Sequence, residues 1–324
     1  MEPSPAASDA SAERRRSPSA TTGDDATPAR RATAASGPAD PPRTVRILPR
    51  SGWQPIDLAE LWRFRELLVI LALRDVRVRY KQTVLGAAWA VIQPVLTMVV
   101  FSIFFGNLAG LNRRIEGGIP YPLFTFCALL PWQLFSSSLT SAGTSLVGNQ
   151  SLISKVYFPR LVIPLASIFG SLVDFFVAFV VLIGMIVAYV LMGHDVAPSW
   201  AIVTLPLFVA LAFLTALAVG LWLSALNVEY RDVRYVIPFI VQFWMFVTPI
   251  AYPSSLVRDR SVALYRLYGL NPMVGVVDGF RWALLGNAPA PGGALAVSVA
   301  MMVALLVGGL YYFRRMERTF ADLI

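Results

Sequence analysis

Residues 161–191 read LVIPLASIFGSLVDFFVAFVVLIGMIVAYVL, and this stretch decides the fold class. Asp174 carries its only charged side chain, and Leu, Val, Ile, Phe and Ala make up most of the rest. About 20 consecutive apolar residues of helix are enough to cross the hydrocarbon core of a bilayer. The stretch is therefore predicted to form a transmembrane helix, long enough to tilt or to reach into the headgroups.

Five more apolar stretches lie on either side of this one, and together they predict an all-α integral membrane protein with six transmembrane helices. The chain is 56% hydrophobic and 14% charged, whereas a soluble domain carries about 25% charged residues. The second span is rich in serine and threonine, which suit helix–helix contact or a polar path. The six predicted spans are 84–106, 123–147, 161–191, 201–225, 235–252 and 294–313.

The N-terminal part of the chain divides into two segments. Residues 1–50 hold eight prolines, eight arginines and no aromatic residue, which predicts a disordered cytoplasmic tail. Residues 51–82 contain an apolar run of only seven residues, Leu67–Leu73, between charged flanks. Such a run is too short to cross, so this segment is predicted to be an amphipathic helix lying in the membrane interface. The transmembrane domain then covers residues 83–324.

Residues 253–293 lie between the fifth and sixth spans and hold two half-length apolar pieces, 264–270 and 272–285. Neither piece can cross a bilayer alone, so we expect a re-entrant or interfacial helical hairpin. A pair of helices lying on the outer surface is the alternative. Asp278 and Arg281, three residues apart, are predicted to form a local ion pair.

Lysine and arginine are distributed unequally between the two sides of the predicted membrane. Six spans place both termini on the same side, where 13 Lys and Arg residues fall even without the 1–50 tail, against six on the other side. Cytoplasmic loops carry the excess of positive charge, so both termini of this multi-pass inner-membrane protein are predicted to be cytoplasmic. Because the basic residues flank apolar spans, the net charge of +8 does not indicate nucleic acid.

Several kinds of chemistry are excluded or weakly supported. A single cysteine, Cys127, rules out a disulfide within the chain. Neither Lys81 nor Lys155, the only lysines, lies in a P-loop motif, and no acidic cluster suits a divalent metal. The chain is therefore not expected to be an enzyme or to bind a cofactor, and energy for transport must come from a partner or from an ion gradient. Asp174, the one acid well inside a span, is a weak basis for ion coupling.

Four stretches together resemble the membrane subunits of ABC-2 type exporters of cell-surface polysaccharides, the permeases for O-antigen, teichoic acid and capsule. They occur in the family's order and spacing, over roughly residues 57–324. They are RDVRVRYKQTVLGAAWAVIQP (74–94), SKVYFPRLVIPL (154–165), LNVEYRDVRYVIPFIVQFWMFVTPIAYP (226–253) and NPMVGVVDGFRWALLG (271–286).

The resemblance implies a homodimer of permeases with two copies of a separate P-loop ATPase subunit, which would bind ATP and Mg. The loop 151–160 is similar to the family's coupling segment, and its aromatic and basic side chains would insert into a groove on the ATPase. A plain connector anchored at the interface is the alternative. The expected coupling residues are Lys155, Tyr157, Phe158 and Arg160, with Glu229, Arg231 and Asp232 of the second cytoplasmic loop as weaker candidates.

The implied substrate is a glycan linked to polyprenyl diphosphate, exported as in lipopolysaccharide biosynthesis. The basic face of the interfacial helix would meet the diphosphate or other anionic lipid headgroups, through Arg74, Arg77, Arg79 and Lys81. Aromatic rings would line the sugar path or else face lipid, and they are Trp89, Phe239, Phe243, Trp244 and Phe246. An ion-gradient-driven glycolipid flippase, a membrane glycosyltransferase and an ABC-2 exporter of drugs are the alternatives.

Overall fold

The structure, a computed structural model, describes residues 58–81, 86–196, 200–317 and 320. These residues belong to one compact unit and are helical, with no strand among them. The all-α prediction is therefore confirmed. The predictions for the 1–50 tail and for the start of the first span at residue 84 fall outside the described residues.

The helices follow one another with short connections. The α-helices are α1 (Leu58–Arg63), α2 (Arg65–Lys81), α3 (Trp89–Phe101), α4 (Tyr121–Gly148), α5 (Gln150–Ile153), α6 (Val162–Leu191), α7 (Leu205–Glu229), α8 (Val233–Val247), α9 (Ser255–Arg258), α10 (Val262–Tyr268), α11 (Pro272–Leu285) and α12 (Gly292–Met316). The π-helix η2 (Ser102–Leu108) extends α3, and short 3₁₀ segments are η1 (Gly86–Ala88), η3 (Leu111–Arg114), η4 (Glu116–Gly118) and η5 (Trp200–Thr204).

Five helical segments within the described residues are long and apolar enough to cross a membrane: Trp89–Leu108, Tyr121–Gly148, Val162–Leu191, Trp200–Glu229 and Gly292–Met316. They match the first four predicted spans and the last. The fifth predicted span corresponds to α8, which has 15 residues. At about 1.5 Å per residue it is shorter than the hydrocarbon core, about 30 Å thick. The count of six crossings therefore stays a prediction.

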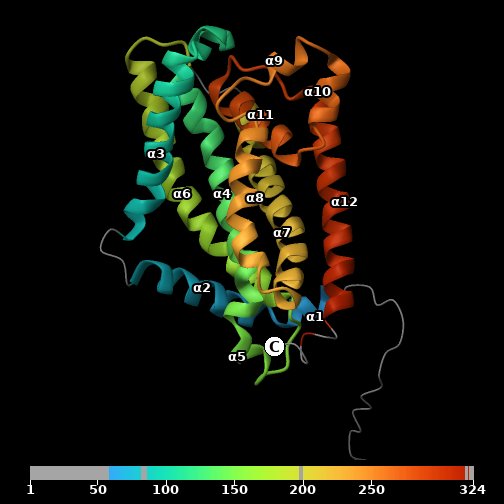
Figure 1. The fold of residues 1–324 in the computed structure, drawn as a ribbon. Coiled ribbons are helices and arrows are strands. Elements are labelled where there is room, and N and C mark those ends of the chain that lie inside the picture. The colour runs from blue at the N-terminus through green and yellow to red at the C-terminus, as the bar shows by residue number, and fades with distance from the viewer. Residues whose placement is uncertain (1–57, 82–85, 197–199, 318–319, 321–324) are drawn as a thin grey trace, which may run out of the picture. The chain divides into compact units, whose positions relative to one another are not determined.

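The helix α4 lies at the centre of this unit, and Figure 1 shows it between α6 on one side and α8 on the other. It packs along α6 and α7, and it is the most buried of the five long segments. The close approach to α7 depends on Gly220, where an added Cβ would lie 2.6 Å from the Cβ of Ala142. A larger residue there would push the two helices apart.

The region between α8 and α12 forms α9, α10 and α11 at one end of the bundle, which we call the hairpin end (Figure 1). Almost the whole of α11 is buried, and it packs against α12, α4 and α7. Gly279 is pressed against the ring of Phe208 in α7, where a Cβ would lie 2.1 Å from a ring carbon. This burial places α11 inside the bundle rather than on its surface.

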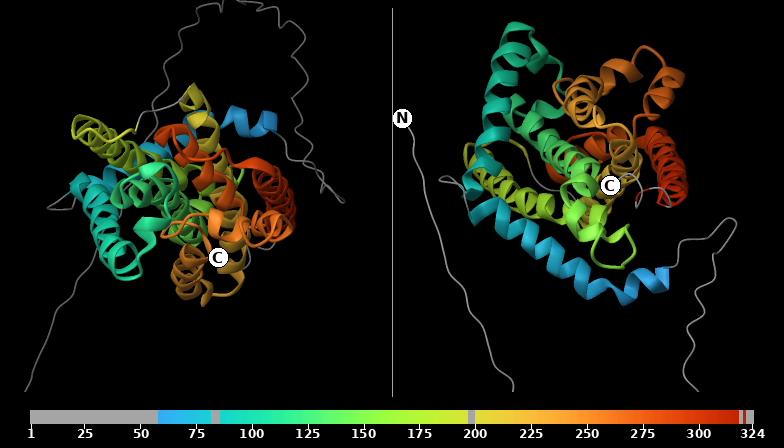
Figure 2. Two further views of the ribbon diagram at one scale, coloured as in Figure 1. Left: turned by 90° about the horizontal axis from the view of Figure 1, so that it is seen from above. Right: turned by 60° about the horizontal axis from the view of Figure 1, so that its bottom comes forward.

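The helices α1, α2 and α5 lie at the opposite end, which we call the α2 end (Figure 1). Figure 2 shows α2 running across the ends of the long helices. Leu71 and Ala72 are its buried residues, and they pack in one cluster with Phe158 and Val162. The described part of the predicted amphipathic segment, residues 58–81, is thus helical apart from a turn at Phe64.

Candidate functional site

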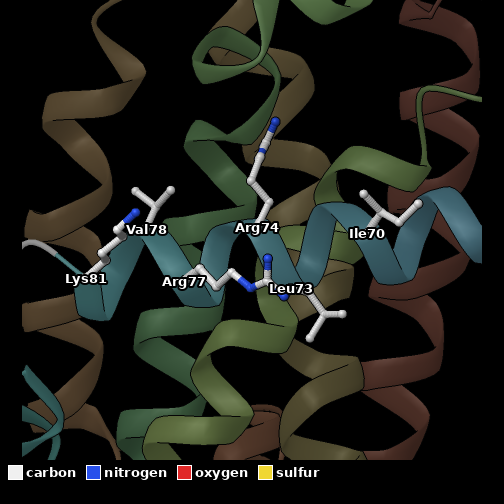
Figure 3. A pocket seen from close by; sticks show the side chains of 6 residues that line it. All are labelled: Ile70, Leu73, Arg74, Arg77, Val78 and Lys81. Atoms are coloured by element: carbon white, nitrogen blue, oxygen red, sulfur yellow. The ribbon is translucent and has the colours of Figure 1, made fainter.

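A groove of about 420 Å³ runs along the exposed face of α2, and its lining side chains are both apolar and basic. Figure 3 shows them spread over the last three turns of the helix. The lining residues are Ile70, Leu73, Arg74, Arg77, Val78 and Lys81. A surface of this kind offers apolar contact and positive charge together, which is what the headgroup end of an anionic lipid requires.

The four basic residues predicted to meet a lipid diphosphate lie in different surroundings. Arg74 donates to Asp75 at 2.8 Å and to Asn149 at 2.6 Å. Arg79 points the other way and is not among the residues of the groove. Arg77 and Lys81 are exposed, and no other described residue forms an ion pair or hydrogen bond with either side chain. These two cations are the ones left available for a ligand.

Arg79 instead contacts Asp174 of α6. Its guanidinium forms an ion pair with this carboxylate and also donates to Ser141 of α4 at 3.3 Å. Tyr80 donates its hydroxyl proton to the same carboxylate. Partial burial, followed by the bond to the Asp174 carboxylate, raises the pKa of Tyr80. The one acid in the long apolar span is therefore held by an arginine, an arrangement that suits fixed packing better than proton transfer.

The loop between α5 and α6 presents its predicted coupling residues in opposite directions. Tyr157 is 89% exposed, and Lys155 is exposed beside it. Phe158, by contrast, is only 5% exposed and lies in the cluster with Leu71. The expectation that Phe158 inserts into a partner does not fit this position, because its ring is already buried in a cluster with side chains of α2, α4 and α6.

Arg160, the last of these residues, is held by the C-terminal end of α12. Its guanidinium donates to the carbonyl of Glu317, and its backbone N–H donates to the Glu317 side chain at 3.3 Å. The guanidinium also lies 5.8 Å from the ring centroid of Phe320. Arg160 therefore fixes the loop to the bundle and leaves Lys155 and Tyr157 as its exposed tip.

The second loop at this end joins α7 to α8. Glu229, Arg231 and Asp232 are all exposed there, beside the exposed Tyr230. Both loops lie at the α2 end of the bundle (Figure 1). The structure thus brings the two sets of predicted coupling residues to the same end as the basic groove.

The aromatic residues predicted to line a path divide between two faces of α8. Trp244 is half-buried: its Nε1 donates to Asn271 at 2.9 Å, and its ring packs edge-on against Phe135 of α4 at 5.0 Å. Phe239, Phe243 and Phe246 lie on the side away from α4 and are more than half exposed, as is Trp89 at the start of α3.

Arg281 has a role that the sequence prediction missed. It is 3% exposed, and its side chain donates to the carbonyls of Pro249 at 2.6 Å, Ile250 at 2.9 Å and Phe124 at 3.3 Å. The predicted pair with Asp278 is present at 4.0 Å. The only sequence signal for this role is an arginine in a half-length apolar helix, because the accepting carbonyls of Phe124, Pro249 and Ile250 lie far from it along the chain.

Asp278 extends the same buried cluster to α10, since Tyr265 donates its hydroxyl to the carboxylate at 3.1 Å. Burial, and then the nearby Asp278 charge, raises the pKa of Tyr265. The described residues contain no group of three or more His, Cys, Asp or Glu side chains that could hold a metal. This cluster contains the Arg281 guanidinium, the Asp278 carboxylate, the Tyr265 hydroxyl and backbone carbonyl oxygens, and it joins α4, α10 and α11 to the end of α8.

Comparison with protein families matches residues 66–285 to the family described as ABC-2 type transporter. The chain is 30% identical over 266 residues to the O-antigen export system permease protein RfbA of Myxococcus xanthus, covering 82% of this chain and 98% of that protein. The protein of the same name from Klebsiella pneumoniae is 27% identical over 260 residues, covering 80% and 95%. The polysialic acid transport protein KpsM of Escherichia coli is 24% identical over 247 residues, covering 76% and 92%.

The family match begins in α2 and ends at the last residue of α11. The basic groove, both loops at the α2 end and the buried Arg281 cluster therefore all lie within the matched region.

Proposed function

The chain belongs to the ABC-2 type transporter family, and from this membership we propose that it is the permease subunit of an ABC exporter for a polyprenyl-diphosphate-linked polysaccharide. The observation that carries the proposal is the similarity to an O-antigen export permease over 98% of that protein's length. The proposed membrane is the inner membrane, crossed six times with α8 as the fifth crossing. The α2 end and both termini then face the cytoplasm.

The energy for export comes, in this proposal, from a separate P-loop ATPase that binds ATP and Mg. Two copies of it would dock at the α2 ends of a permease homodimer. The exposed tip at Lys155 and Tyr157 would make the main contact, and Glu229, Arg231 and Asp232 would add charged contacts beside it. Phe158 and Arg160 would act indirectly, because they hold the tip on the bundle.

The diphosphate of the lipid carrier is proposed to meet the groove on α2. Arg77 and Lys81 supply charge without a described protein partner, and Ile70, Leu73 and Val78 supply apolar contact for the carrier chain. Each basic residue near a membrane surface contributes about 1 kcal/mol to the binding of anionic headgroups. Arg79 is excluded from this role, because Asp174 and Ser141 already occupy its guanidinium.

The pairing of Asp174 with Arg79 also weighs against the ion-gradient alternative. A carboxylate that carries ions must lose and regain its partner during each cycle. Asp174 instead has both an arginine and a tyrosine hydroxyl as partners from α2. We therefore assign this acid to packing between α2 and α6.

Mild purification from the native membrane, followed by mass spectrometry, tests the proposal. A soluble P-loop ATPase is expected in a one-to-one ratio with the permease, and deletion of the permease gene should leave lipid-linked glycan inside the cell. Repeated preparations without any ATPase, together with unchanged surface glycan in the deletion strain, would contradict the proposed function.

A further inference from the structure

The face of α4 that its neighbours leave partly uncovered is polar throughout. Between Leu123 and Leu146 every residue of this helix that is not buried carries a hydroxyl or an amide. These residues are Gln133, Ser136, Ser137, Thr140, Ser141 and Thr144, and we call them the α4 polar strip. The apolar residues of α4 over the same length are all covered by neighbouring helices.

The other long segments show the opposite pattern. On α6, for example, the exposed residues include Phe176, Val180 and Val187, at 59%, 68% and 51% exposure. This is the surface expected where a helix faces lipid tails, because a polar group in hydrocarbon has no partner outside the helix. The uncovered face of α4 therefore does not have the composition of a lipid-facing surface.

The strip lies on one side of the helix. Gln133, Ser137, Thr140 and Thr144 follow one another at spacings of four, three and four residues, which aligns them along a single face. With a rise of about 1.5 Å per residue, this face is roughly 16 Å long. On one flank Ile237 of α8 touches α4 at Gly143, and on the other Arg79 of α2 reaches Ser141. Figure 2 shows α4 between α3 and α8 when the α2 end is turned forward.

Four of the five hydroxyls of the strip donate their protons to backbone carbonyls and keep lone pairs that can accept. Ser137, Thr140 and Thr144 each donate to a backbone carbonyl one turn earlier, at 2.7, 2.8 and 2.9 Å. Ser136 likewise donates to the carbonyl of Gln133, at 3.2 Å. A hydroxyl oxygen that donates once can still accept, so the strip presents a row of acceptors.

A row of acceptors selects among the parts of a lipid-linked glycan. It suits a ligand that is rich in O–H donors better than an anion, which can only accept, because four of its hydroxyl protons are already used. Charge is confined to Arg79 at the edge of the strip, and this cation is already paired with Asp174. The strip can therefore hydrogen-bond sugar hydroxyls weakly along its length without binding a phosphate tightly.

We propose that the α4 polar strip lines the water-filled path through which uncharged, hydroxyl-rich saccharide units pass. The inference rests on the proposed export function, and it names the side chains that the glycan contacts during export. The path starts beside α2, where Arg79 touches Ser141, and runs toward Gln133 in the interior of α4. The diphosphate stays at the basic groove while the sugars enter the strip.

The proposal is tested by access of water to single cysteines in inside-out membrane vesicles, in which the α2 end faces the added reagent. Cys127, the only native cysteine, is buried, so the native chain supplies the background. Ser137→Cys and Thr140→Cys are then treated with a charged methanethiosulfonate reagent. Ser138→Cys is the matched control on the buried side of the same helix, and Val180→Cys is the control for a surface facing lipid.

Ser137→Cys and Thr140→Cys are expected to react at least about tenfold faster than both controls, because only a thiol reached by water ionises to the reactive thiolate. Labelling as slow as that of Val180→Cys would overturn the proposal and assign the strip to lipid. Spontaneous disulfide formation between two copies of Thr140→Cys would also overturn it and assign the strip to a subunit contact. Each of these results is independent of whether an ATPase copurifies, so failure of the path and failure of the export function are distinguishable.

Discussion

At the residue scale, Arg281 shows how one cation can hold a broken stretch of backbone among apolar helices. The chain leaves helical geometry after Val247, and the carbonyls of Pro249 and Ile250 have no helical partner. The planar guanidinium serves both of them and Phe124 at once, while its face stacks on the Phe124 ring at 3.5 Å. A lysine cannot reproduce this fork, because its ammonium is a single point of charge.

Arg281→Lys is therefore expected to lower the thermal unfolding midpoint of the purified protein strongly. At least two of the three carbonyl bonds are lost, and each bond to a charged group contributes about 1.5–3 kcal/mol. Arg113→Lys is the control, since Arg113 is exposed and no other described residue pairs with its side chain. Equal midpoints for the two variants would show that the Arg281 bonds are not stabilising.

The adjacent residues Tyr157 and Phe158 give a second prediction at this scale. Phe158→Ala leaves a cavity in the buried cluster that includes Leu71 and Val162, and the loss of a buried phenylalanine costs about 3–5 kcal/mol. Tyr157→Ala removes a ring that is 89% exposed and leaves the bundle intact. The yield of folded protein in the membrane should fall for the first variant only. Similar yields would mean that Phe158 contributes little to packing.

At the element scale, sequence reasoning located the long helices well and their contacts poorly. The apolar run at 161–191 predicts α6 almost to the residue, because the bilayer sets a length that composition alone can satisfy. The ion pair between Arg79 of α2 and Asp174 of α6 could not be predicted from composition, because the two residues are 95 positions apart in the chain. Composition also could not separate Arg79 from Arg77, because that difference depends on how α2 is rotated against the bundle.

The link between α2 and α6 can be measured with a double-mutant cycle. Arg79→Ala leaves Asp174 without its cation and should lower the free energy of unfolding by about 1–3 kcal/mol. This loss is smaller than the loss from breaking a fully buried ion pair, because the Arg79 side chain is 34% exposed. Asp174→Asn in the same chain should restore part of this loss. Thermal unfolding of the two single variants and the double variant gives the coupling energy. Strictly additive effects would mean that the two side chains do not interact.

On the scale of the whole molecule, the described unit buries one charged pair at the hairpin end and leaves most of the predicted coupling residues exposed at the α2 end. At the hairpin end the charged pair Asp278 and Arg281 is turned inward and satisfied by carbonyls and Tyr265. At the α2 end the charged groove and both loop tips remain open. Composition indicated which segments are basic, but burial of Phe158 and exposure of Tyr157 depend on the packing of the whole bundle.

Exposure of the loop tip predicts the effect of removing it. Replacing Lys155 and Tyr157 together with alanine should leave membrane insertion and thermal stability unchanged. Copurification of the partner ATPase and glycan export should each fall at least about tenfold, because a tyrosine at the centre of an interface contributes about 2 kcal/mol or more to binding. Tyr311→Ala is the control, because Tyr311 is similarly aromatic and 53% exposed but lies on α12. Normal export by the double variant would refute the docking role of the tip.

The central position of α4 has a consequence for biogenesis. The ribosome makes residues 121–148 before the helices that cover them, α6, α7 and α11, have been synthesised. Its mean hydropathy is also the lowest of the five long segments. The nascent α4 must therefore wait at the translocon or beside an insertase until its later neighbours arrive. Ribosomes stalled when α4 but not α6 has left the exit tunnel should hold α4 at the insertion machinery, whereas completed chains should have released it.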